Sequence, residues 1–160
     1  MALVAGALAI GADFQNLTVK NHQPLDSGTV TSGTFTTTRS GATSPVGVSF
    51  TAPPSGKVKI HWAGGIAGSG TGGSAFYLMG FQILTGSTIG GGSSVVAGDD
   101  NKALQVTNLV SANGERQGGR SELVQSLTPG NSYNVSLMYR VGTGTGTFSR
   151  VSVTVDPCIA

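Results

Sequence analysis

A period of two in the apolar residues constrains the fold of this chain more than any other feature. In residues 133–141 every odd-numbered side chain is apolar or aromatic, and Asn134, Ser136, Met138 and Arg140 stand between them. Residues 151–155 repeat the pattern with valine at each odd position. Successive side chains of a β-strand point to opposite faces, so this pattern predicts strands that bury one face in a core.

Other segments carry the same signal, and turn residues separate them. Residues 46–50 and 57–62 alternate in the same way, with Trp62 on the apolar face of the second segment. The apolar run 75–84 is bounded by glycines, which favours a central strand over a helix. "APPSGK" and Pro129-Gly130 are typical of turns. With about eight to ten strands, the sequence predicts an all-β fold, an antiparallel β-sandwich or jelly roll.

Two further expectations concern residues 132–157. The strands over 132–141 and 151–155 are joined by "GTGTGT", and we predict that they pair as a hairpin. Phe148 is out of phase with the three valines, which predicts a bulge near Ser149 and Arg150.

Composition narrows the class of protein. The chain has 160 residues, enough for one domain with a short appendage, and only 10% of them are charged. Alternating apolar positions argue against disorder despite 26 glycines. A net charge of +2 without a Lys/Arg cluster argues against nucleic-acid binding, and no apolar run is long enough to span a membrane. The single Cys158 excludes an internal disulfide and leaves an intermolecular one open.

No pattern of catalytic or metal-binding residues is visible. Asp99 and Asp100 form the paired carboxylates of the chain, and we interpret them as a solvated turn. His22 and His61 lie far apart in the sequence, without a second ligand at metal-binding spacing. The glycine-rich stretches 68–73 and 142–146 lack the Gly-Lys-Ser/Thr of a phosphate loop. We therefore expect no enzyme activity, no cofactor and no metal.

Four aromatic residues could serve either packing or sugar binding. Trp62, Tyr77, Tyr133 and Tyr139 all fall on apolar faces of predicted strands. We expect them to pack in the core or between subunits rather than to stack on a ligand. A role in host adhesion would require exposed groups instead, such as Tyr77 or the polar loop that we predict over 112–120.

The N-terminal residues do not look like part of the core. We interpret 1–27 as an arm and 28–160 as the β-sandwich domain. The apolar side chains of the arm would be exposed if the domain folded alone, and exposed apolar segments typically mark docking surfaces; they are Leu3, Val4, Leu8, Ile10 and Phe14. The alternative is that the arm packs on its own domain or forms an edge strand.

Several phrases of the sequence resemble a known family. The opening "AGALAIGADFQNL" is similar to the start of many phage tail and fibre proteins. "FTAPPSGKV" (50–58), "DDNKAL" (99–104), "LTPGNSYNVSLMYRV" and "GTGTFSRVSVTV" (within 127–155) resemble a small β-domain of virion proteins from phages that infect actinobacteria. The resemblance covers nearly the whole chain and brings no catalytic residue with it.

The resemblance implies a structural protein of the virion, and it does not specify the position of the protein in the particle. A tail-associated position (minor tail or fibre-like) is favoured, with capsid decoration as the alternative and a carbohydrate-binding adhesion module as a further one. Expected partners are other virion proteins, copies of the chain in a trimer, and a host cell-surface glycan. The trimeric expectation is an analogy with jelly-roll heads of the complement-C1q or tumour-necrosis-factor type.

Overall fold

The structure, a computed structural model, describes residues 19–22, 25–70, 75–107 and 114–158. They form strands β1 (Val19–His22), β2 (Ser27–Val30), β3 (Gly47–Thr51), β4 (Val58–Gly68), β5 (Phe76–Thr85), β6 (Ser94–Val96), β7 (Leu104–Thr107), β8 (Arg116–Val124), β9 (Ser132–Val141) and β10 (Gly146–Pro157), and one 3-10 helix, η1 (Asp100–Lys102). No helix among these residues is long and apolar enough to cross a membrane.

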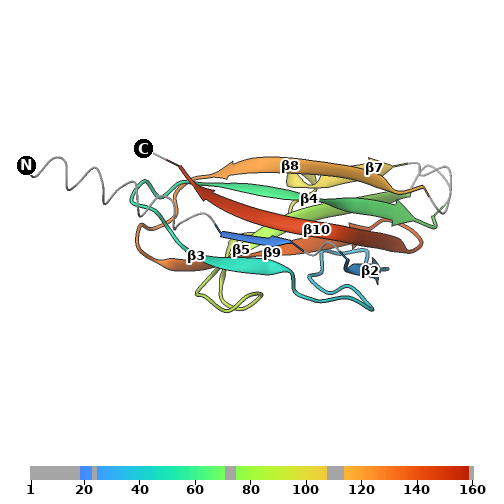
Figure 1. Ribbon diagram of the computed structural model, residues 1–160, viewed down its shortest axis with the longest axis horizontal. Helices are drawn as coiled ribbons and strands as arrows, with labels where there is room; N and C mark the ends of the chain where they lie inside the picture. The colour runs from blue at the N-terminus through green and yellow to red at the C-terminus, as the bar shows by residue number, and fades with distance from the viewer. Residues whose placement is uncertain (1–18, 23–24, 71–74, 108–113, 159–160) are drawn as a thin grey trace, which may run out of the picture.

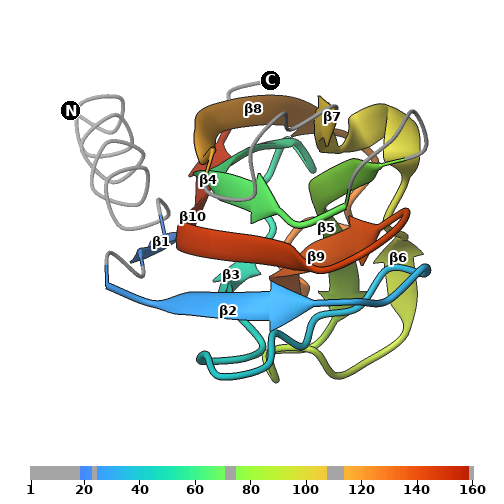
Figure 2. The same ribbon diagram turned by 90° about the vertical axis from the view of Figure 1, so that its right-hand side faces the viewer.

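The strands form two antiparallel five-stranded sheets that pack face to face (Figures 1 and 2). Sheet A has the order β1-β10-β4-β8, with β2 pairing β10 beyond the end of β1. Sheet B has the order β3-β9-β5-β6, with β7 also pairing β5. If β1 with β2, and β6 with β7, are each counted as one interrupted edge strand, eight strands remain in the order of a jelly roll. The predicted all-β sandwich is confirmed.

The predicted hairpin is wrong. β9 and β10 follow each other in the chain, but β9 lies between β3 and β5 in sheet B, while β10 lies between β4 and the β1/β2 edge in sheet A. The segment 142–145 therefore crosses from one sheet to the other. The alternating pattern could not reveal this, because a strand buries its apolar face equally well in either sheet.

The predicted bulge in β10 is confirmed. The register between β10 and β4 shifts between Ser149 and Ser152, and Arg150 has a positive φ of 50°. The extra residue lets Phe148 and Val151 both point into the core, where each is 0% exposed.

The apolar faces of the two sheets meet in a single core. Trp62 of β4 packs on Phe81 of β5 at 4.9 Å between ring centroids, and its indole Nε1 donates to the Met79 carbonyl oxygen at 2.9 Å. Tyr139 of β9 packs on Phe148 of β10, also at 4.9 Å. These contacts join the sheets, so the alternating apolar side chains of both sheets fill the same core.

The domain begins earlier than the sequence suggested. β1 and β2 lie within the predicted arm or at its boundary, yet β1 pairs residues 152–155 of β10 over its whole length. The Asn21 side-chain amide also donates to the Gly47 carbonyl oxygen of sheet B at 3.0 Å. Residues 19–22 are thus an edge strand of the sandwich, which corrects the arm boundary at 27. Likewise, Arg116–Arg120 lie in β8 rather than in a loop.

Candidate functional site

Loops of the chain itself cover part of the outer face of sheet B. Asn134 of β9 is fully buried there, accepts a hydrogen bond from Gly90 N, and donates to the carbonyl oxygens of Gly86 and Gly91. These three bonds hold the 86–91 loop over the sheet. An apolar face position, Leu84, is 6% exposed beside it.

The rest of that face is covered by other segments. Thr36 exchanges two backbone hydrogen bonds with Tyr139, at 2.9 and 2.8 Å, which brings the preceding Phe35 close to Gly80 of β5. Ala103, directly after η1, also lies over Gly80 and is 4% exposed. Sheet B is therefore packed on both sides.

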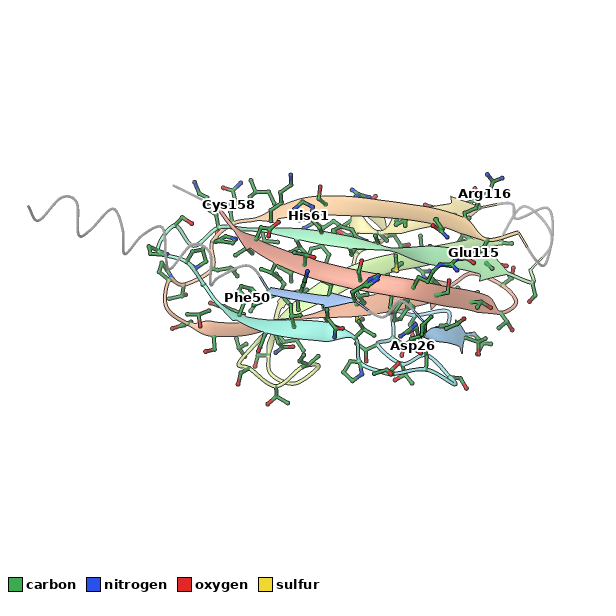
Figure 3. All side chains as sticks on the ribbon, viewed as in Figure 1. Asp26, Phe50, His61, Glu115, Arg116 and Cys158 are labelled. Carbon is green, nitrogen blue, oxygen red and sulfur yellow. The ribbon has the colours of Figure 1, made fainter. Side chains whose placement is uncertain are left out.

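The outer face of sheet A contrasts with this arrangement. Outward positions on its strands are partly or fully exposed, and apart from Leu123, which is 48% exposed, their side chains are polar or small. From the pairing register they are Lys20, His22, Lys59, His61, Ala63, Gln117, Gly119, Ser121, Leu123, Ser152, Thr154 and Asp156. Figure 3 shows His61 on this side, with Glu115 and Arg116 toward the far end of the sandwich. We call this surface the open face.

Two adjoining hollows of about 300 and 450 Å³ lie on the open face. Ala63 and Ser152 line both of them, so the hollows form one shallow trough across β10, β4 and β8. One end is bordered by His61, Thr154 and Ser121, and the other by His22, Gln117 and Arg150. The hollow forms over Ala63 and Gly119, which carry a small side chain or none, whereas the Glu115 carboxylate occupies the space over Gly65.

The charges on the open face are partly paired. Glu115 accepts hydrogen bonds from Ser149 and Arg150, and His61 Nε2 lies 3.1 Å from the Asp156 carboxylate. Lys20 and Lys59 project from the same face and form no ion pair with any described residue. The two acidic groups of the face thus already have partners, while two lysines do not.

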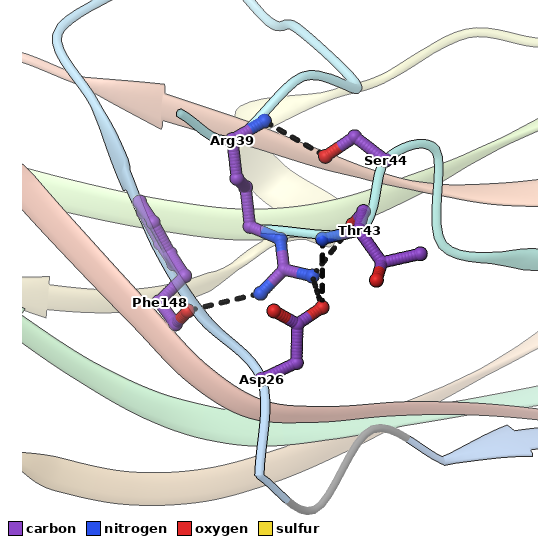
Figure 4. A network of polar contacts seen from close by, with 5 residues as sticks. All are labelled: Asp26, Arg39, Thr43, Ser44 and Phe148. Atoms are coloured by element: carbon purple, nitrogen blue, oxygen red, sulfur yellow. Dashed lines mark hydrogen bonds and ion pairs between the residues drawn. The ribbon is translucent and has the colours of Figure 1, made fainter. Parts of the chain in front are cut away.

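A buried polar network lies elsewhere, at the sandwich edge near β2 (Figure 4). Arg39 is 1% exposed; its guanidinium donates to Asp26 Oδ2, to the Thr43 carbonyl oxygen and to the Phe148 carbonyl oxygen at 2.9–3.0 Å. Asp26 also accepts from Thr43 N. The network fastens β2 and the 39–44 turn to β10, which is a structural role.

Tyr139 lies beneath that network. The Arg39 guanidinium is 5.4 Å from the ring centroid, and the phenol oxygen has no hydrogen-bond partner among the described residues. Burial raises the pKa of Tyr139 above its ordinary value, although the positive charge of Arg39 opposes the shift.

The structure places all four aromatic candidates in the core. Trp62, Tyr77, Tyr133 and Tyr139 are each at most 5% exposed. The Tyr77 and Tyr133 hydroxyls accept hydrogen bonds from Gly70 N and Thr128 N, at 2.7 and 3.1 Å. The alternative of an exposed Tyr77 that stacks on a sugar is therefore wrong.

The other candidates remain separate from one another. Asp99 caps η1 by accepting from Asn101 N, and Asp100 forms an ion pair with Arg140 at 2.5 Å, so the two carboxylates have different partners. No group of three or more metal-ligating side chains occurs within the described ranges. Leu3, Val4, Leu8, Ile10 and Phe14 lie outside the described residues.

Sequence reasoning missed the open face as a surface. The signal was present in the polar residues that alternate with the inward positions of 58–62 and 151–155. Only the pairing of β1, β10, β4 and β8 shows that these residues are neighbours.

Comparisons with known proteins add little beyond the fold. Neither a protein-family model nor a curated protein matches this chain. Among solved structures, it is similar to the CBM22-1 xylan-binding domain of Xyn10C from Paenibacillus barcinonensis (11% identity, TM-score 0.40, covering 88% of this chain and 95% of that one). It is also similar to the structure of infectious bursal disease virus Gt strain (11%, TM-score 0.47, 86% and 31%) and to CBM35 of Abf62 from Cellvibrio japonicus (12%, TM-score 0.37, 89% and 99%). At such identities and scores the likeness concerns the β-sandwich fold and nothing of function.

Proposed function

We propose that this protein is a non-enzymatic structural protein of a phage virion, tail-associated, which docks on the particle through its N-terminal segment. The observation that carries the proposal is the point where that segment joins the domain. Residues 1–18 directly precede β1, and β1 is paired into the edge of sheet A. A segment anchored in this way transmits its attachment to the whole sandwich.

Two further features support a structural role. Apart from the His61–Asp156 pair, the ion-paired carboxylates of the described residues bind separate arginine or lysine partners, and no group of three or more metal-ligating side chains occurs in that part of the chain. The jelly roll is also an architecture that viral shell proteins use, although the same fold serves lectins. Capsid decoration remains the alternative position, because the open face and the N-terminal segment would serve either location.

The test is incorporation of a truncated protein into particles. A variant that begins at residue 16 loses the five candidate docking residues Leu3, Val4, Leu8, Ile10 and Phe14 and keeps β1. We expect it to fold like the full chain and to be absent from purified virions. Incorporation at the normal level would rule out docking through this segment. Labelling of full-length protein in particles would then separate tail from capsid.

A further inference from the structure

The two outer faces of the sandwich differ in how far other segments of the chain cover them. Sheet B is sealed by the 86–91 loop, Phe35 and Ala103, whereas the open face of sheet A carries a polar trough. Backbone groups of the central strands β4 and β10 are used by the sheet ladders on both sides. A ligand on this face must therefore bond to side chains.

We propose that the open face binds an extended acidic polysaccharide along its trough. This proposal does not depend on attachment to a virion, since it concerns the isolated protein. Hydroxyl, imidazole and amide groups at the trough (Ser121, Thr154, His61, Gln117) supply donors and acceptors for sugar hydroxyls. The adjoining hollows give room for more than one sugar ring on a nearly flat floor.

Charge selects an acidic polymer over a neutral one. Of the two acids of the face, Glu115 pairs with Arg150, and Asp156 lies 3.1 Å from His61 Nε2. Lys20 and Lys59 have no ion-pair partner among the described residues; they lie next to the trough, since Lys20 is opposite Thr154 and Lys59 is opposite Asp156 in the sheet register. A carboxylate on the ligand would supply that partner by charge-assisted hydrogen bonds. The described face has no aromatic side chain, so a neutral sugar would find no stacking platform to compensate for its desolvation.

Other polymers fit the face less well. A peptide strand would leave its own backbone groups unpaired on a sheet face. A nucleic acid usually requires many phosphate contacts from lysine and arginine, and the face offers two unpaired lysines. We therefore commit to a uronic-acid type of polymer.

The experiment measures binding of the full-length protein to polygalacturonate, with dextran as the neutral probe and dextran sulfate as a non-specific polyanion. We expect binding to polygalacturonate and none to dextran. Lys59→Glu should weaken the affinity about tenfold, while Lys102→Glu, the same charge change on η1, should leave it within about twofold. Ala63→Trp should fill the trough and abolish binding, whereas Ser49→Trp, at an exposed position of β3 on the other sheet, should not.

Several results would overturn the proposal. One is absence of polygalacturonate binding; another is equal binding of dextran. Binding that dextran sulfate reproduces, and that neither Lys59→Glu nor Ala63→Trp reduces relative to its control, would show general attraction to polyanions without a site. If Ala63→Trp fails to fold, the exposed pair Lys59→Glu and Lys102→Glu still decides the outcome.

Discussion

Among single residues, Arg39 carries a buried positive charge that is stabilised by one neighbouring carboxylate. Its side chain is fully buried, and Asp26 is its ion-pair partner at 3.0 Å. A guanidinium that loses such a partner keeps the full cost of its removal from water.

We predict that Asp26→Ala destabilises the domain by about 3 kcal/mol, measured by urea unfolding. Asp100→Ala is the matched control, because it removes the half-exposed partner of Arg140; such pairs contribute about 1 kcal/mol or less. Equal losses in the two variants would mean that Asp26 does not stabilise Arg39 in the way described.

Tyr139 permits a prediction about alkaline pH. Because burial raises its pKa, the folded state keeps the phenol proton at pH values where the unfolded chain, with an ordinary pKa of about 10, releases it. The stability present below pH 10 is therefore lost as pH rises further, by about 1.4 kcal/mol per pH unit for one group.

Tyr139→Phe should remove that part of the alkaline loss. At pH 7 the variant should be as stable as the parent or slightly more so, because the phenol oxygen it removes makes no hydrogen bond within the described residues. Urea midpoints of both proteins from pH 7 to 11 test this. Parallel curves over the whole range would contradict it.

Among the elements, the strands themselves were predictable and their partners were not. Alternation identified β3, β4, β9 and β10, and a continuous apolar run between glycines identified β5. The phase of Phe148 identified the bulge, because alternation depends on which way neighbouring side chains point. The pairing of β9 and β10 depends on contacts with strands far away in the sequence. Because strand pairing cannot be read from local alternation, the sequence also does not reveal the open face or show that residues 19–22 belong to the sandwich.

A glycine at the end of a strand can be required for packing, which composition alone does not show. A Cβ added to Gly68, at the end of β4, would lie 2.0 Å from the Tyr77 ring. A Cβ added to Gly33, in contrast, would have no atom within 4 Å. We predict that Gly68→Ala lowers stability by about 1–3 kcal/mol, while Gly33→Ala changes it by less than about 0.5 kcal/mol. Thermal unfolding of both variants provides the measurement.

The cover of sheet B should depend on one side chain. We expect Asn134→Ala to release the 86–91 loop, because three partly buried hydrogen bonds disappear together. Limited proteolysis should then cut within that loop, whereas Asn131→Ala, an exposed neighbour, should leave the loop protected. Unchanged protection in Asn134→Ala would mean that other contacts hold the cover.

For the whole molecule, the position of β1 decides where the N-terminal segment can be removed. We predict that protein 16–160 unfolds at the temperature of the full chain, and that protein 28–160 unfolds at a clearly lower one. The shorter form lacks β1 and Asp26, and so loses both an edge strand and the partner of Arg39. Equal melting temperatures for all three would contradict this account. Light scattering on 16–160 then tests the expected trimer without damage to the sandwich.

The pairing of β10 also has a consequence for the order of events during synthesis. β10 lies between β4 and the β1/β2 edge, so a ribosome must add more than a hundred residues after β1 before sheet A can close. Until then β1, β2 and β4 lack their shared neighbour and expose unpaired edges. Contacts between such distant segments form slowly. The nascent chain therefore passes through a period in which it is open to aggregation and to chaperones, and that period ends when its tenth strand emerges.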